Sequence, residues 1–136
     1  MSIHGVIQNV KWPELFLTET NSGNVDGETF GKCENQRWIG EYSYDQQKRI
    51  NLVALQNKFT GDYLAWDDHM NVVMKSSKYW WKVVFVEGNV GFQVPEEASA
   101  NARIFFTLEL EADRSVILKA HEGEPNHAQL WKTLHK

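Results

Sequence analysis

The segment Trp66-Asp67-Asp68-His69 holds the densest group of side chains suited to binding a ligand. It joins an aromatic ring, two carboxylates and an imidazole in a predicted turn, and binding residues are often carried by such exposed connections. A purely structural interpretation is also open. In it, Trp66 covers the hydrophobic core, and Asp67 and Asp68 only stabilise the turn, as aspartates commonly do.

A second group of polar side chains lies near the beginning of the chain. Asp26, Glu28 and Asn35 are expected to line one side of a pocket, with Trp12 or Phe30 as an aromatic platform. The alternative is a solvated loop in which the asparagine stabilises its own turn.

A third group is the polar segment from His121 to His127, which contains a glycine and a proline. Asn126 and His127 are its candidate ligand contacts. The separation of His121 from His127 matches no recognised pattern of metal ligands, so no metal is expected here. A flexible loop without a binding role is the alternative.

Motifs that would indicate catalysis are missing from the sequence. There is no nucleophile elbow, phosphate-binding loop, zinc signature or paired-carboxylate motif. The single cysteine, Cys33, lies in a polar loop with no histidine at a spacing that implies a dyad, so an inert thiol is expected. We therefore expect no enzyme activity and no cofactor.

Composition excludes several kinds of partner. The 136 residues carry a net charge of -4 without a run of lysine or arginine, and nucleic acids or anionic membranes require a basic surface. No apolar run approaches the roughly 18 residues of a membrane span. The first residues lack the pattern of a signal peptide. A cytoplasmic protein, or one exported without a classical signal, is expected.

A tryptophan-centred cue recurs along the chain. It reads Asn35-Gln36-Arg37-Trp38 in the first third, Gln129-Leu130-Trp131 near the end, and more weakly Tyr79-Trp80-Trp81 between them. Each copy is expected to begin a buried strand. Its tryptophan fills the core, and the glutamine satisfies backbone groups where a loop meets the strand.

The spacing of this cue divides the chain into three similar units of about residues 2–47, 48–89 and 90–136. Each unit holds four short predicted strands separated by turn residues, which indicates an all-β fold. One unit is too small to bury its own apolar face, so the three must share a core. Six strands closing a barrel, capped by three hairpins, solve this problem. The sequence therefore predicts a single β-trefoil domain with pseudo-threefold symmetry over residues 1–136.

One strand shows a clear alternation of acidic and apolar residues. Glu109, Glu111 and Asp113 alternate with Leu108 and Leu110. This pattern is typical of a strand with one face in water, so the three acidic residues are expected to be exposed.

On the glutamine–tryptophan cues, the chain resembles the ricin-B-type β-trefoil lectins, whose repeats end in Gln-x-Trp. The lack of disulfides and of a signal peptide is more similar to the cytosolic lectins of fungi than to secreted members. Leu52-Val53-Ala54-Leu55 and Gly61-Asp62-Tyr63-Leu64-Ala65 also resemble repeats of the fascin and hisactophilin branch. Fungal β-trefoil protease inhibitors share the length and the Met-Ser start.

The lectin resemblance implies where a sugar would bind. Family sites use an aspartate at the end of the second strand, an aromatic ring, and an asparagine just before the Gln-x-Trp glutamine. Asn35 matches the asparagine position of the first unit, where the second and third units have Tyr79 and Ala128. The three residues at the aspartate position are Thr18, Trp66 and Thr107. A shift by one residue would replace them with Glu19, Asp67 or Leu108.

The resemblance implies a lectin-like protein, a monomer or homodimer, whose partners are glycans or glycoproteins. Its carbohydrate-binding candidates are Asp26, Asn35, Trp66, Asp67, Asp68, His69, Asn126 and His127. A protein-interaction trefoil is the alternative, as an enzyme-associated light chain or as a protease inhibitor. An inhibitor would present a loop such as Pro95–Ala102 or Lys11-Trp12-Pro13-Glu14. An actin-binding or membrane-linked trefoil is a third possibility, opposed by the acidic charge.

Overall fold

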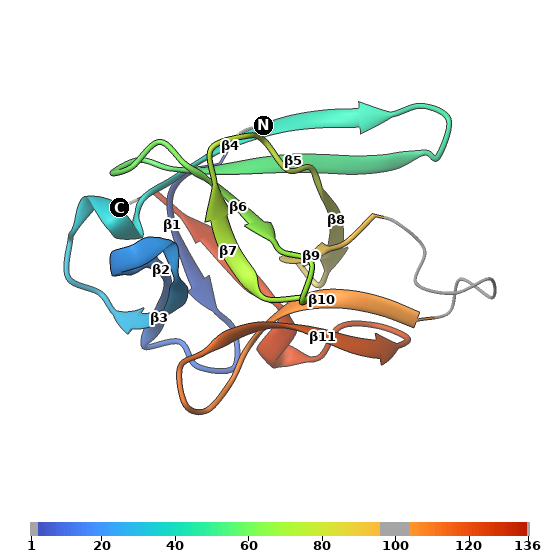
Figure 1. The fold of residues 1–136 in the computed structure, drawn as a ribbon. Coiled ribbons are helices and arrows are strands. Elements are labelled where there is room, and N and C mark those ends of the chain that lie inside the picture. Colours follow the sequence, from blue (N-terminus) through green and yellow to red (C-terminus); the bar gives the residue numbers. More distant parts are fainter. Residues whose placement is uncertain (1–2, 96–103, 136) are drawn as a thin grey trace.

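The computed structural model of the protein describes residues 3–95 and 104–135 (Figure 1). Within this part, twelve strands and three short 3-10 turns follow one another along the chain. The strands are β1 (Ile3–Asn9), β2 (Leu15–Glu19), β3 (Val25–Thr29), β4 (Trp38–Asp45), β5 (Ile50–Asn57), β6 (Tyr63–Trp66), β7 (Val72–Lys75), β8 (Trp81–Val86), β9 (Asn89–Gln93), β10 (Ile104–Leu110), β11 (Val116–Glu122) and β12 (Trp131–Leu134). The 3-10 turns are η1 (Asn21–Gly23), η2 (Glu34–Gln36) and η3 (His127–Gln129).

Six of the strands form a closed barrel. Going round it, β1 pairs with β4, β4 with β5, β5 with β8, β8 with β9, β9 with β12, and β12 again with β1. Every neighbouring pair is antiparallel, so this ring has no open edge. The barrel takes the first and fourth strands of each unit, and its six strands match the number that the sequence predicted.

The remaining strands make three hairpins, β2–β3, β6–β7 and β10–β11, which gather toward one end of the barrel (Figure 1). Two bridges join them: Asp26 pairs with Ser115, and Asn71 pairs with Ile117. The backbone N–H of Gly27 also donates to the carbonyl of Arg114 at 2.8 Å. The predicted β-trefoil is therefore confirmed.

Three tryptophans, one from each unit, fill the core. Trp38, Trp81 and Trp131 are buried, and their indole N–H groups donate to the carbonyls of Leu17, Leu64 and Leu108 at 3.0, 2.9 and 3.2 Å. A buried indole needs such a partner, because an unpaired N–H away from water is costly. The central expectation drawn from the Gln-x-Trp cue is confirmed.

Two details of the sequence analysis are wrong. Gln36 and Gln129 do not begin strands. They end the turns η2 and η3, and the strands start two residues later at Trp38 and Trp131. Glu109 is not on a solvent face, because both faces of β10 are buried from Thr107 to Leu110.

Two buried asparagines, which the sequence analysis did not single out, tie one unit to the next. The side-chain N–H of Asn9 donates to the carbonyl of Ala128 at 3.0 Å, and that of Asn57 donates to the carbonyl of Asn35 at 2.9 Å. Each asparagine also accepts backbone N–H bonds from its own following loop, including that of Lys11. The turns η2 and η3 are thereby held by strands of a neighbouring unit.

The pairing of β1 with β12 brings distant parts of the sequence together. Val6 lies opposite Leu134, and the ring Nδ1 of His135 is 3.0 Å from the carbonyl oxygen of His4. The strands approach so closely that a Cβ atom on Gly5 would collide with the carbonyl of Leu134. Glycine is required there by this close approach.

Candidate functional site

The indole–carbonyl bonds give a structural alignment of the three units. The carbonyls of Leu17, Leu64 and Leu108 receive equivalent bonds, so the next residue of each strand is also equivalent. These next residues are Thr18, Ala65 and Glu109. Relative to Thr18, the sequence alignment was therefore wrong by one residue for Trp66 and by two for Thr107. The third unit carries an acid, Glu109, at the position that Thr18 occupies in the first unit.

Gln36 organises the polar face of the first unit. Its side-chain oxygen accepts the backbone N–H of Gly31 at 2.8 Å. Its amide nitrogen donates to the carbonyl of Thr29 at 2.8 Å and to the hydroxyl of Thr18 at 3.2 Å. Gln36 is itself buried and bonds to three groups of its own unit, so it shapes the site from inside. The role expected for this glutamine is confirmed.

A pocket of about 340 Å³ opens beside Gln36. It is lined by Thr18, Thr20, Asn21, Glu28, Thr29, Gly31, Cys33, Asn35 and Gln36. Asn35 lies on η2, and its side-chain nitrogen donates to the carbonyl of Glu19 at 3.0 Å. Its side-chain oxygen is buried and has no hydrogen-bond partner. An unpaired buried acceptor is costly, and a ligand hydroxyl would satisfy it once the Asn35 side chain turned this oxygen into the pocket. We call this the first-unit pocket.

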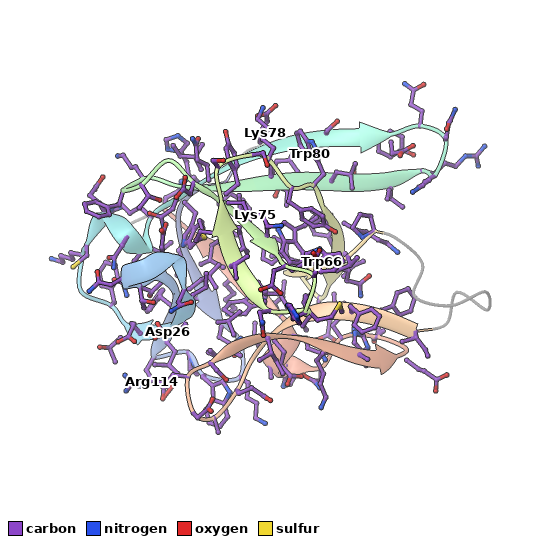
Figure 2. The ribbon with its side chains drawn as sticks, viewed as in Figure 1. Asp26, Trp66, Lys75, Lys78, Trp80 and Arg114 are labelled. Atoms are coloured by element: carbon purple, nitrogen blue, oxygen red, sulfur yellow. The ribbon has the colours of Figure 1, made fainter. Side chains whose placement is uncertain are left out.

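A pair of carboxyl groups stands on β3 beside this pocket. Asp26 lies directly opposite Thr18, and Glu28 follows on the same face of the strand. Burial raises the pKa of Asp26 to about 6, helped by the hydrogen bond and the charge of Glu28, while Arg114 opposes the shift. Arg114 reaches over from the β10–β11 turn, with its Nη1 3.8 Å from an oxygen of Glu28 (Figure 2).

Of the first-unit candidates, Glu28 and Asn35 line the pocket, and Asp26 stands across the hairpin from its wall. One oxygen of Asp26 is buried without a partner, like that of Asn35. The two expected aromatic platforms do not line the pocket. Phe30 packs against Phe16, with ring centroids 5.4 Å apart, and Trp12 packs against the core.

Of the second-unit candidates, Asp67 lines a polar hollow of about 430 Å³ where β3, β7 and β11 approach one another, and Trp66, Asp68 and His69 do not line it. Trp66 is half-buried and meets the edge of Tyr79, with ring centroids 6.1 Å apart. The carboxylate of Asp67 accepts the backbone N–H groups of His69 and Asn71, both at 2.9 Å, and these bonds lower its pKa. The turn role that the sequence left open for Asp67 is therefore observed. Asp68 and His69 project into solvent.

In the third unit, the amide nitrogen of Gln129 donates to the carboxylate of Glu109 at 3.0 Å. Burial raises the pKa of Glu109 to about 7, and the hydrogen bond and charge of Glu111 add to the shift. Asn126 is used to cap η3, because its side chain accepts the N–H of Ala128 at 3.0 Å while Gln129 caps the backbone of Asn126 in return.

The remaining third-unit candidate, His127, is exposed. Together with Asn126 it lines a separate hollow of about 290 Å³ against the β8–β9 turn. The eight candidate residues are thus spread over separate places. Among the three hollows that they line, the first-unit pocket is the one whose lining residues include an unpaired buried acceptor.

No family model matches the sequence, and no curated protein matches it either. Solved structures do match. The Rhizoctonia solani agglutinin superposes with a TM-score of 0.72 at 18% identity, covering 100% of this chain and 96% of its own. A ricin B-like lectin from Macrolepiota procera, in complex with lactose, gives 0.71 at 15% identity with the same coverage. The fold is that of the ricin B-like lectins.

A third neighbour shows the same β-trefoil within a much longer protein. A mosquitocidal holotoxin matches with a TM-score of 0.71 at 18% identity, and covers 100% of this chain. This chain spans only 17% of the holotoxin. At such identities the likeness establishes the fold and leaves the function of the β-trefoil to be argued from its own residues.

Cys33 is free and exposed, at the mouth of the first-unit pocket. Of the loop Pro95–Ala102, only Pro95 belongs to the described residues. Among those residues, no group of three or more His, Cys, Asp or Glu side chains is placed to hold a metal, and no helix is long and apolar enough to cross a membrane.

Proposed function

We propose that this β-trefoil binds carbohydrate in the first-unit pocket. The observation that carries the proposal is the unpaired side-chain oxygen of Asn35 in the wall of a polar hollow of about 340 Å³. A sugar hydroxyl is a donor of the right kind for this acceptor. The hydroxyls of Thr18 and Thr20 and the carboxyl of Glu28 line the same hollow and offer further hydrogen bonds to a polyol.

The names of two neighbouring structures support this proposal. One of them is an agglutinin and another was solved in complex with lactose. Lactose is therefore a suitable first probe for this chain. The binding is proposed to be non-enzymatic, because the pocket contains no nucleophile paired with a base and no pair of carboxyl groups spaced across a substrate.

Replacing Asn35 with alanine is expected to weaken sugar binding about tenfold, which corresponds to roughly 1.4 kcal/mol and to one lost hydrogen bond in a partly dry site. Titration calorimetry against the best sugar of a glycan array measures the change. Asn51→Ala is the matched control, because Asn51 is exposed on β5 and away from the pocket. Equal affinity in the two variants, with both folded by circular dichroism, would place the site elsewhere.

Cys33 offers a direct test of where the sugar sits. It is the single cysteine of the chain and lines the first-unit pocket, so its alkylation by iodoacetamide reports on one place only. Saturating sugar is expected to slow this alkylation about fivefold or more, because a bound ligand blocks access to the thiol. An unchanged rate under saturation would show that the sugar binds outside this pocket, whatever its affinity.

One observation favours a second candidate function, protease inhibition. The loop from Lys11 to Glu14 is exposed at three of its four residues, yet its backbone is fixed. The N–H groups of Lys11 and Trp12 both donate to the side chain of Asn9 at 3.0 Å. A rigid exposed loop is what an inhibitor presents to a protease cleft. Full activity of a panel of cysteine and serine proteases in the presence of the protein would exclude this role.

A further inference from the structure

Another hollow lies at the junction of the first and second units. The β4–β5 hairpin is paired as far as Asp45 opposite Ile50, whereas the β8–β9 hairpin ends at Val86 opposite Asn89. The longer hairpin extends beyond the barrel (Figure 1). A hollow of about 280 Å³ lies between it and the segment before β8. Its lining includes Asp45, Lys48, Ile50, Leu52, Lys78 and Trp80. We call it the junction groove.

The floor of the junction groove is apolar and aromatic. Ile50 and Leu52 are two residues apart on β5, so their side chains share a face of the strand. Trp81 is directed into the core, and the adjacent Trp80 is half-buried on the outer side (Figure 2). An indole beside two branched aliphatic side chains is a surface that packs well against the C–H face of a sugar ring.

Some of the charged side chains around this floor have a partner and one does not. The ammonium of Lys78 is 2.7 Å from a carboxylate oxygen of Glu41 and 5.8 Å from the centroid of the Trp80 ring. The hydrogen bond to Glu41 raises the pKa of Lys78, so this ammonium stays charged. The side chain of Asp45 accepts the backbone N–H groups of Gln47 and Lys48, both at 3.0 Å. Asp45, the acid that lines the groove, is therefore engaged with backbone N–H groups, and Glu41, beside the groove, is engaged with Lys78.

The ammonium of Lys48 has no partner among the residues that the structure describes. An unpaired cation at the rim of an aromatic floor binds an anion more strongly than a neutral hydroxyl, because its hydrogen bond to an anion joins two opposite charges. The first-unit pocket has the opposite character, since Glu28 lines it and Asp26 stands beside it. The two hollows are thus suited to ligands of different charge.

We infer that the junction groove is a second binding site, for a sugar residue that carries an acidic group. The ring lies on Trp80 and Leu52, and its carboxylate or sulfate pairs with Lys48 while Lys78 flanks it. This goes beyond the proposed function, because the groove shares no lining residue with the first-unit pocket. We therefore expect that adding an acidic group to a neutral sugar raises its affinity through the junction groove and not through the first-unit pocket.

The test compares lactose with sialyllactose and with sulfated lactose by titration calorimetry. At about 50 mM salt, at least one acidic probe is expected to bind about tenfold more tightly than lactose, and about 300 mM salt is expected to reduce this gain. Preference for the sialylated probe identifies a carboxylate ligand, and preference for the sulfated probe identifies a sulfate. Acidic probes that bind no more tightly than lactose would overturn the inference.

Variants then locate the site. Lys48→Gln and Trp80→Ala are each expected to abolish the gain, whereas Lys132→Gln, the same charge change at an exposed position on β12, is expected to keep it. Asn35→Ala separates the two proposals, since it should weaken lactose and leave the extra affinity of the acidic probe intact. Loss of that extra affinity in Asn35→Ala, with retention in folded Trp80→Ala, would place the acidic group in the first-unit pocket and overturn the junction groove.

Discussion

Trp131→Ala is expected to lower the free energy of unfolding by roughly 3–5 kcal/mol, the range for truncation of a large buried aromatic side chain. The substitution removes a fully buried indole from the common core of all three units, and it leaves the carbonyl of Leu108 without the 3.2 Å bond it receives. Urea unfolding at equilibrium, followed by circular dichroism, measures the change.

Two further variants divide this loss into its parts. Trp131→Phe keeps an aromatic ring and removes only the N–H bond and part of the volume, so it is expected to cost less than Trp131→Ala, by about half. Trp80→Ala removes the same side chain from the outer surface of the barrel and is expected to cost about 1 kcal/mol or less. A cost for Trp80→Ala equal to that of Trp131→Ala would contradict the assignment of the core.

Glu109→Gln is expected to stabilise the protein at about pH 8, by on the order of 2 kcal/mol, and to change little at about pH 4. The folded-state pKa of Glu109, about 7, lies above its ordinary value of 4.5, so folding favours the protonated form. The stability contributed by this group is complete below the ordinary pKa and is lost as the pH rises through about 7. Glutamine resembles the protonated acid and can keep the bond from Gln129.

Thermal unfolding at several pH values measures this effect. The wild-type protein is expected to lose stability relative to Glu109→Gln between about pH 4.5 and pH 7, where folded and unfolded protein bind different numbers of protons. Glu122→Gln is the control, because Glu122 is an exposed acid on the neighbouring strand β11. A constant difference between wild type and Glu109→Gln across this range would show that the buried acid is not the source.

The β-trefoil could be predicted because its strongest signals are local and repeated. Trp38 and Trp131 each follow a glutamine at the same spacing, and a large ring in a chain without disulfides has few places other than the core. The strand starts could not be predicted to the residue. Gln36 and Gln129 end 3-10 turns because the side chains of Asn57 and Asn9 bond to the carbonyls of the residues just before them. Those two contacts join residues that are 22 and 119 positions apart in the sequence.

The candidate site was only partly predictable for a related reason. Asn35 was found because it adjoins the cue. The acid of the third unit was missed because Leu108, Glu109 and Leu110 are all buried, so the alternation of apolar and polar residues no longer tells which side chain faces which way. The indole bond to the carbonyl of Leu108 fixes the register, and a bond between distant strands leaves no trace in the spacing of residues. The junction groove depends in the same way on how far one hairpin extends past the barrel.

The contact of β1 with β12 makes the barrel a ring without a first or last member. Because residues 4 and 135 already touch across this seam, a short peptide link there would join strands that are neighbours in space. The chain could then be opened at the exposed Glu87-Gly88 turn instead, and the strands would keep their order around the barrel. Such a circularly permuted protein would carry both the first-unit pocket and the junction groove uncut, with its new ends at the junction between the second and third units.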